Sequence, residues 1–196
     1  MKKIIFLIAP FVFLLSACAD TTAGVDPNSS ASTSPSSTAS VTAAIYGVPS
    51  SCKATSILAT ISPLIKGAKF IDSKWQPAAG TELADFLNNG GIACSYGNAP
   101  AEIGTTVKWV SKADSLFSNR VADWNRIKYS KIDLPDFDES AAYFLYKPVG
   151  PTQEFQIWAL NILIGGTWIQ INASYLHDIE SGTSLIQSAI DSSLKN

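Results

Sequence analysis

The chain is poor in the side chains that most catalytic and metal-binding chemistry needs. It contains a single histidine, His177, so a serine–histidine or cysteine–histidine arrangement would have no other imidazole to serve as its base. His177 falls in a predicted loop, where a solvated side chain is the ordinary interpretation. The sequence also lacks a Gly-x-Ser-x-Gly motif, a glycine-rich phosphate loop and a His-Glu-x-x-His motif. These absences argue against an enzyme, and we expect no cofactor and no metal.

Charge is also scarce, and what there is favours the acidic side. Charged residues make up only 15% of the chain, against about 25% in typical soluble proteins. The formal net charge of −2 becomes −4 if Lys2 and Lys3 are removed with the N-terminal segment described next. A weakly acidic surface does not attract nucleic acid or anionic lipid. We therefore expect no nucleic-acid partner.

The N-terminus has the pattern of an export signal. Lys2 and Lys3 precede an apolar run over residues 4–15, which is too short for a transmembrane helix of about 20 residues but typical of a signal peptide. The run ends in Leu15-Ser16-Ala17-Cys18. This tetrapeptide resembles the lipobox at which bacterial signal peptidase II cuts before a lipid-modified cysteine. The alternative is an ordinary secretory signal in which Cys18 occurs by chance.

The lipobox implies a protein anchored on the extracytoplasmic side of the cell membrane. Residues 1–17 would be removed, and diacylglycerol on Cys18 would supply the two acyl chains that stable anchoring requires. Residues 18–44 are dominated by Ser, Thr, Ala and Pro, a composition too polar to form a core, and predict a disordered tether. Residues 45–196 have the size of one globular domain.

Cys52 and Cys94 remain once Cys18 is assigned to the lipid. In an exported protein, an even remainder of cysteines predicts a disulfide, worth up to roughly 4 kcal/mol for a loop of this length in the chain-entropy model. A metal pair or a redox pair are the alternatives. Metal sites usually have closer ligand spacing with more His or Cys nearby, and redox pairs favour Cys-x-x-Cys.

Helical patterns occur early, in the middle and at the end of the domain. The first follows Ser50 and Ser51 as candidate caps and carries apolar residues at helical spacing up to Ile61, before Pro63. A short helix is predicted over residues 81–87. A longer one is predicted to open with a capping box at residues 111–114. The last, over residues 183–194, has one apolar stripe.

Strand patterns lie between these helices. Residues 103–109 alternate apolar and polar side chains, and residues 92–96 and 141–146 form shorter candidates. Residues 155–164 and 167–173 flank Gly165-Gly166, a strong hairpin signal, with Trp168, Gln170 and Asn172 on one face of the second strand. Consecutive strands joined by tight turns predict an α+β fold. In it, one antiparallel sheet packs against an N-terminal, a middle and a C-terminal helix.

Two further features bear on function. The acidic run Asp133-Leu-Pro-Asp136-Phe-Asp138-Glu139 suggests a weak calcium site or a carboxylate pair for glycoside hydrolysis, or else a solvated loop. The five tryptophans suggest a pocket for carbohydrate or lipid beside the sheet, although aromatic rings mostly fill cores. The candidate ligand-binding residues are Trp158, Trp168, Tyr143, Tyr146 and Gln170.

The combined pattern resembles small cell-envelope lipoproteins of actinobacteria. The resemblance rests on the lipobox, the Ser/Thr-rich tether, Cys52 opening the first helix and the segment Gly-Gly-Ile-Ala-Cys94-Ser-Tyr. Some of these proteins are similar to the extracellular sensor domains of envelope serine/threonine kinases. Those domains typically have a second disulfide, which this chain lacks, so the resemblance implies fold and location but no sensor role.

Three functions are compatible with the sequence. The first is a non-catalytic module that binds a small amphipathic ligand or an envelope protein. The second is an envelope hydrolase that acts through carboxylates such as Asp136 and Asp138. The third is a structural or scaffolding lipoprotein with one exposed apolar patch. We favour binding because the acid/base inventory is thin whereas the aromatic inventory is rich.

Overall fold

A computed structural model describes residues 44–137, 140–151 and 154–195. The predicted signal peptide, Cys18 and the predicted tether up to residue 43 lie outside the described residues. Among the residues that are described, no helix is both long enough and apolar enough to cross a membrane.

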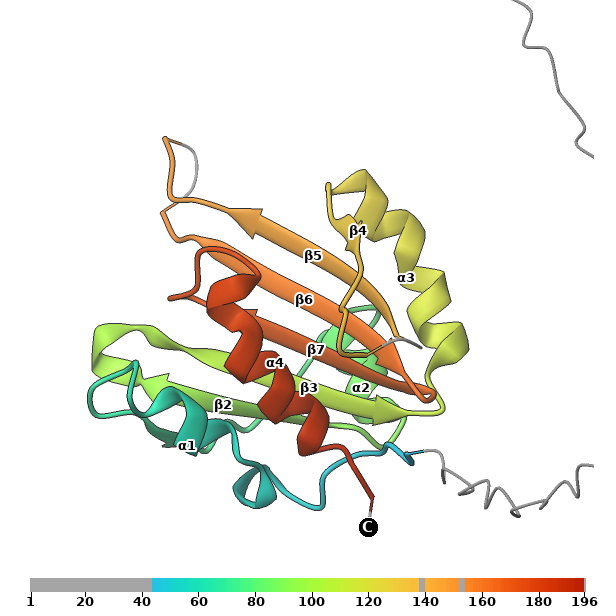
Figure 1. The fold of residues 1–196 in the computed structure, drawn as a ribbon, viewed down its shortest axis with the longest axis horizontal. Helices are drawn as coiled ribbons and strands as arrows, with labels where there is room; N and C mark the ends of the chain where they lie inside the picture. The colour runs from blue at the N-terminus through green and yellow to red at the C-terminus, as the bar shows by residue number, and fades with distance from the viewer. Residues whose placement is uncertain (1–43, 138–139, 152–153, 196) are drawn as a thin grey trace, which may run out of the picture. The chain divides into compact units, whose positions relative to one another are not determined.

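The domain is built on one antiparallel sheet, as the sequence predicts, and this sheet has seven strands in the described part of the chain (Figure 1). The order across the sheet is β1-β2-β3-β7-β6-β5-β4. The strands are β1 (Lys69–Ile71), β2 (Ile92–Asn98), β3 (Ile103–Ser111), β4 (Ser130–Ile132), β5 (Ala141–Lys147), β6 (Ile157–Ile164) and β7 (Thr167–Ala173). The two edge strands were not predicted. Each has only three residues, and short edge strands are a common protection against unwanted strand pairing.

Four α-helices accompany the sheet within the described residues. They are α1 (Ile57–Ile61), α2 (Glu82–Asn88), α3 (Asp114–Arg126) and α4 (Thr183–Asp191). Short 3-10 helices cover Cys52–Ala54, Ala99–Ala101 and Glu180–Gly182. The first helix is shorter than expected and begins after Ser56, because the segment with Cys52 forms a separate 3-10 turn.

The predicted capping box is wrong. Ser111 is the last residue of β3 and pairs with Thr167, so it cannot cap a helix three residues later. The chain turns instead at Lys112, which has a φ of 56°. Ala113 then occupies the N-cap position without a side-chain cap, and its N–H donates to the Gly166 carbonyl at 2.9 Å. The start of α3 is therefore fixed by the neighbouring β6–β7 turn.

Each face of the sheet has its own apolar core. The face that we call the α4 face packs against α1 and α4 through residues such as Ile61, Trp109, Ile171 and Ile190. The opposite face, the α3 face, packs against α2 and α3 through Phe86, Val110, Phe117, Trp124 and Trp168. The alternation predicted for β7 is confirmed, since Trp168 and Ile169 belong to different cores. Burying each such side chain contributes about 1.5–3 kcal/mol.

The ends of the sheet differ. The β6–β7 turn has φ of 51° at Gly165 and 70° at Gly166, the left-handed pair that a tight hairpin turn requires. Tyr46 lies against this turn, because a Cβ on Gly165 would come within 2.6 Å of its ring. Tyr46 also bridges to Leu194. The described chain thus begins at the end of the sheet opposite to the β2–β3 turn.

Candidate functional site

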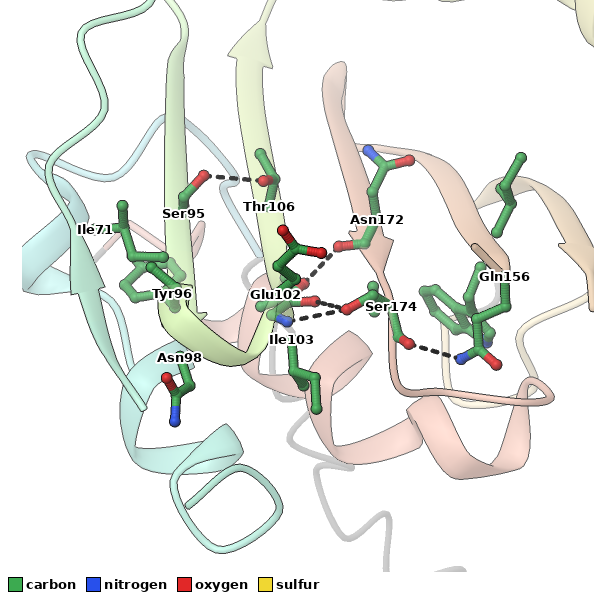
Figure 2. Close-up of a pocket in the computed structure, with 16 residues that line it drawn as sticks. Ile71, Ser95, Tyr96, Asn98, Glu102, Ile103, Thr106, Gln156, Asn172 and Ser174 are labelled. Atoms are coloured by element: carbon green, nitrogen blue, oxygen red, sulfur yellow. Dashed lines mark hydrogen bonds between the residues drawn. The ribbon is translucent and has the colours of Figure 1, made fainter. Parts of the chain in front are cut away.

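A hollow of about 440 Å³ lies at the end of the sheet that carries the β2–β3 turn (Figure 2). Its lining comes from β1, β2, β3, the start of β6 and the end of β7, and includes no residue of α2 or α3. We call it the hairpin groove. Its size lies in the range of small-molecule sites, about 300–1,000 Å³.

A row of polar side chains crosses three strands inside the groove. Ser95 on β2 pairs with Thr106 on β3, and Thr106 pairs with Asn172 on β7. Because paired residues share a face, the three side chains lie side by side on the α3 face. They are nearer to the β2–β3 turn than the part of this face that α2 and α3 cover. The Ser95 and Thr106 hydroxyls form a hydrogen bond of 2.9 Å (Figure 2). We call Ser95, Thr106 and Asn172 the polar row.

Apolar side chains flank this row. Ile71 pairs with Ser95 across the β1–β2 ladder and continues the row toward the sheet edge. Ile103 and Ile157 also line the groove and are 40% and 38% exposed. Isoleucine side chains exposed to this extent are available to a ligand. The groove therefore offers a polar surface with apolar borders.

Hydrogen bonds fix the wall of the groove that follows β7. Gln156 donates through Nε2 to the carbonyls of Ser174 and Leu176, at 2.9 and 3.0 Å. The Ser174 hydroxyl oxygen accepts from the Gly104 N–H at 3.0 Å. These bonds join the segment after β7 to the start of β3 and to the residue before β6 (Figure 2). The wall is therefore held in place without a ligand, which lowers the entropy cost of binding.

The groove is nearly free of ionisable groups. Among the described residues that line it, there is no lysine, arginine or histidine, and the one carboxylate belongs to Glu102, an exposed residue in the left-handed region with φ of 53°. Tyr96 also lines the groove. Burial raises the pKa of Tyr96, against a smaller opposing effect of its hydrogen bond with Thr55. Glu102 is thus the one acidic side chain among the described lining residues, and no basic side chain accompanies it there.

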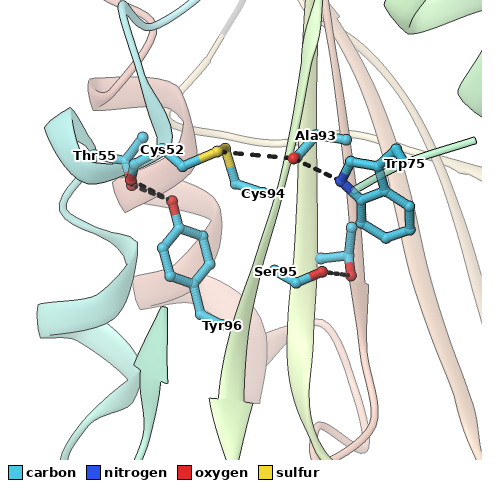
Figure 3. The surroundings of a disulfide bond; sticks show 8 residues. Cys52, Thr55, Trp75, Ala93, Cys94, Ser95 and Tyr96 are labelled. Atoms are coloured by element: carbon cyan, nitrogen blue, oxygen red, sulfur yellow. Dashed lines mark hydrogen bonds between the residues drawn. A yellow bond between two sulfur atoms is a disulfide. The ribbon is translucent and has the colours of Figure 1, made fainter. Parts of the chain in front are cut away.

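A disulfide supports the β2 side of the groove (Figure 3). Cys52 and Cys94 are bonded with their Cα atoms 5.4 Å apart, as the cysteine count predicts. Two residues along β2, the Tyr96 hydroxyl donates to the Cys52 carbonyl at 2.6 Å. On the other side of the strand, the Trp75 indole donates to the Ala93 carbonyl at 2.9 Å. The disulfide segment therefore holds the strand that supplies Ser95 and Tyr96 to the groove.

The five residues predicted to bind a ligand do not lie at one place. Trp158 lines the groove but is only 1% exposed, and its indole donates to the Asp178 carbonyl at 2.6 Å. Tyr146 pairs with Trp158 on the α4 face. Trp168, Gln170 and Tyr143 lie on the α3 face, nearer the helices. The structure brings these last three together and leaves the other two on the opposite face.

Trp168 and Gln170 belong to a buried polar network beneath α2 and α3, which we call the Glu82 cluster. Asn161 Oδ1 accepts from Trp168 Nε1 at 3.0 Å and from Gln170 Nε2 at 2.8 Å. The Glu82 carboxylate accepts from Gln170 Nε2 and, at 2.7 Å, from Trp124 Nε1. Among the described residues, no donor reaches the buried Gln170 Oε1. The cluster therefore keeps one open acceptor, and a ligand role for Gln170 stays a prediction.

Two titratable side chains beside the cluster have shifted pKa values. Burial lowers the pKa of Lys108, and the nearby charge of Glu82 partly opposes that shift. Burial and the charge of Glu82 raise the pKa of Tyr129 to about 12, against a smaller opposing effect of Asn161. Lys108 Nζ also lies 5.5 Å from the centre of the Phe86 ring. The Glu82 cluster, with its carboxylate and two buried amides, thus lies beside an amine and a phenol.

The acidic run lies elsewhere. Asp133 and Asp136 line a smaller cavity of about 220 Å³ between the β4–β5 connection and α4, together with Glu180. Asp138 and Glu139 lie outside the described residues. His177 is exposed, in the loop after β7. Within the described part of the chain, no group of three or more His, Cys, Asp or Glu side chains is arranged to hold a metal.

Sequence reasoning found part of the groove and missed the rest. It placed Asn172 on the same strand face as Gln170, and the register confirms this. It did not single out Thr106 or Ser95, because small polar residues on a strand usually face solvent. Only the pairing of β2, β3 and β7 brings the three into one row. Glu82 was missed for a similar reason, since its partners are far away in sequence.

Comparison with known proteins adds no family. No family model, no curated protein and no solved structure matches this chain.

Proposed function

We propose that the protein is an extracytoplasmic lipoprotein whose domain binds a small amphipathic ligand in the hairpin groove. The anchor would be diacylglycerol on Cys18, supported by the apolar run and the Leu15-Ser16-Ala17-Cys18 motif. The Cys52–Cys94 disulfide supports the same location, because structural disulfides persist in oxidising compartments outside the cytoplasm.

The observation that carries the binding proposal is the chemistry of the groove. A hollow of about 440 Å³ holds the polar row beside Ile71, Ile103 and Ile157. Small-molecule sites typically combine apolar walls with a few polar groups that fix orientation. An amphipathic ligand matches both parts at once, with its polar end on the row and its apolar end on the isoleucines.

Binding is favoured over turnover because the groove is poor in acids and bases. General acid–base catalysis needs a titratable group within hydrogen-bond reach of the substrate. Among the described residues that line the groove, the one carboxylate is that of Glu102. The Tyr96 hydroxyl, whose pKa is raised, points away from the groove and is already bonded to Thr55 and the Cys52 carbonyl. Hydroxyls and amides, which dominate the remaining polar lining, recognise ligands by hydrogen bonding without exchanging protons.

Two experiments test the proposal. Cell fractionation should place the protein in the membrane fraction, and Cys18→Ser should release it, because the acyl chains would be lost.

Extraction of the protein purified from its own membranes with organic solvent should yield a small molecule. Asn172→Ala should reduce the amount recovered, whereas Asn125→Ala, on the exposed side of α3, should not. Equal recovery from both variants would exclude the groove as the binding site.

The hydrolase alternative has one observation in its favour. Asp133, Asp136 and Glu180 line the 220 Å³ cavity beside α4, with apolar side chains such as Ile186. Carboxylates that converge on a cavity could act on a glycosidic bond. Release of reducing sugar from envelope polysaccharide, abolished by Asp136→Asn and retained by Asn172→Ala, would replace the binding proposal with this one.

A further inference from the structure

We infer that the ligand of the hairpin groove has an uncharged, hydroxyl-bearing headgroup of the sugar or glycerol type, and not a phosphate, sulfate or ammonium group. The inference rests on the proposed binding function and specifies its ligand class. It follows from the hydrogen-bonding capacity of the polar row, from the charge of the groove and from the position of its apolar residues.

The polar row presents donors and acceptors together. Each hydroxyl has one donor and two acceptor positions, so Ser95 and Thr106, which share one hydrogen bond, keep one O–H donor and several acceptor positions. Among the lining residues drawn in Figure 2, the Asn172 amide makes no side-chain hydrogen bond, and it adds both a donor and an acceptor. A sugar or glycerol hydroxyl is itself a donor and an acceptor, so it can use both.

Charged headgroups find no matching partner. Sites for phosphate or sulfate rely on arginine or lysine side chains, or on a helix N-terminus, and no basic side chain is among the described residues that line the groove. Its only carboxylate, Glu102, repels an anion. An ammonium group has donors only, so it cannot use the donors of the row, and a single exposed carboxylate attracts it weakly.

The apolar residues indicate where the rest of the ligand lies. Ile71 adjoins the row at Ser95, while Ile103 and Ile157 are partly exposed at the turn end of the groove. A chain attached to the headgroup can therefore run over isoleucine side chains and lose contact with water. The groove thus fits a headgroup with a short apolar chain better than a free sugar.

The test uses three amphiphiles that share an octyl chain and differ only in headgroup. They are octyl β-glucoside, octyl sulfate and octylammonium, each kept below its micelle concentration at low salt. The protein is the whole mature chain with Cys18→Ser, so that its own acyl chains cannot fill the groove. Binding is followed by the NMR shifts of the backbone amides of Ser95, Thr106 and Asn172.

Octyl β-glucoside should bind roughly tenfold more tightly than either charged probe, as expected for two or more extra hydrogen bonds. Thr106→Val should weaken the glucoside about two- to tenfold and leave octyl sulfate unchanged. Glu102→Gln should strengthen octyl sulfate by up to about fivefold, whereas Glu180→Gln, outside the groove, should not.

Each other outcome counts against the inference in a distinct way. If octyl sulfate or octylammonium binds as tightly as the glucoside at these amides, the headgroup assignment is wrong and the binding function stands. If none of the three probes shifts the amides of the polar row, the groove is not an amphiphile site. The proposed function and the inference would then fail together.

Discussion

The Trp124 indole donates a hydrogen bond of 2.7 Å to the Glu82 carboxylate, and this contact joins the two helices of the α3 face. Trp124 lies near the end of α3, and Glu82 is the first residue of α2. Both helices also meet through Arg120, which binds Asp85 in a salt bridge. The Glu82 carboxylate also accepts from the Gln170 amide, which in turn donates to Asn161.

Replacing Glu82 should destabilise the domain. Glu82→Ala removes the acceptor of two N–H donors, so we expect a loss of about 1.5–3 kcal/mol in the free energy of unfolding, the range for hydrogen bonds to a charged group. Glu82→Gln keeps one acceptor oxygen and should cost less. Urea unfolding measures both. Glu180→Gln, at an exposed position, should stay within about 0.5 kcal/mol of the wild type. A Glu82→Ala protein as stable as this control would show that the cluster contributes no net stability.

Removing the disulfide should lower stability by about 2–4 kcal/mol. The double variant Cys52→Ser/Cys94→Ser tests this by urea unfolding, with the reduced wild type as a second sample. We also expect weaker protection of the amides around Ser95 from hydrogen exchange, because the disulfide segment holds β2 through Tyr96. Unchanged exchange at Ser95 in the double variant would show that β2 is held by its strand neighbours alone.

The tyrosines predict a loss of stability at high pH. The pKa of Tyr129 and that of Tyr175 are both raised to about 12, mainly by burial. Between pH 10 and 12 the folded chain keeps protons that the unfolded chain releases, so the free energy of unfolding should fall as pH rises. The lowered pKa of Lys108 makes the free energy of unfolding rise with pH, up to the ordinary lysine pKa of 10.5. The loss of stability caused by the tyrosines should therefore be measured above pH 10.5.

Absorbance at 295 nm gives the matching titration. Part of the tyrosine signal should appear only near pH 12, and Tyr129→Phe should remove a share of that late signal. The same variant should make stability less sensitive to pH above 10.5. If the titration curve of Tyr129→Phe matches that of the wild type, the absorbance change near pH 12 does not come from Tyr129.

Gly91 should not tolerate a side chain. A Cβ at this position would lie 2.3 Å from the Trp109 carbonyl oxygen and 2.7 Å from the Phe86 carbonyl oxygen, so Gly91→Ala forces backbone to move. We expect a loss of about 1–3 kcal/mol in the free energy of unfolding. Gly150→Ala is the control, because its Cβ would meet no atom within 4 Å. The midpoints of thermal unfolding of the two variants are compared. Equal midpoints would show that the chain at Gly91 has room for a side chain.

The fold was more predictable from sequence than the site. The period of two over β3 and the Gly165-Gly166 signal report local backbone geometry, and both are confirmed. The first helix is present but shorter than predicted, and the capping box at Ser111 is wrong, because neighbouring segments decide the conformation there. Ser111 is held by pairing with Thr167, and pairing over such a distance leaves no local pattern.

The candidate site depends on contacts that are distant in sequence. Tryptophans suggested a pocket, but Trp158 and Trp168 are buried on opposite faces. The polar surface of the groove comes from Ser95, Thr106 and Asn172, which are close only because β2, β3 and β7 are neighbours in the sheet. The hairpin signal predicts that β7 pairs with β6, which precedes it along the chain. No local pattern predicts that β7 also pairs with β3.

Native mass spectrometry of the protein extracted from its own membranes detects both the lipid anchor and a small ligand in the groove. We predict a mature chain that begins at Cys18, carries acyl groups, lacks two protons for the Cys52–Cys94 bond and holds an additional component that denaturation releases. Thr106→Val should lower the occupancy of that component. A chain without acyl groups would show that Cys18 carries no lipid anchor, and one with no releasable component would show that the groove holds no ligand.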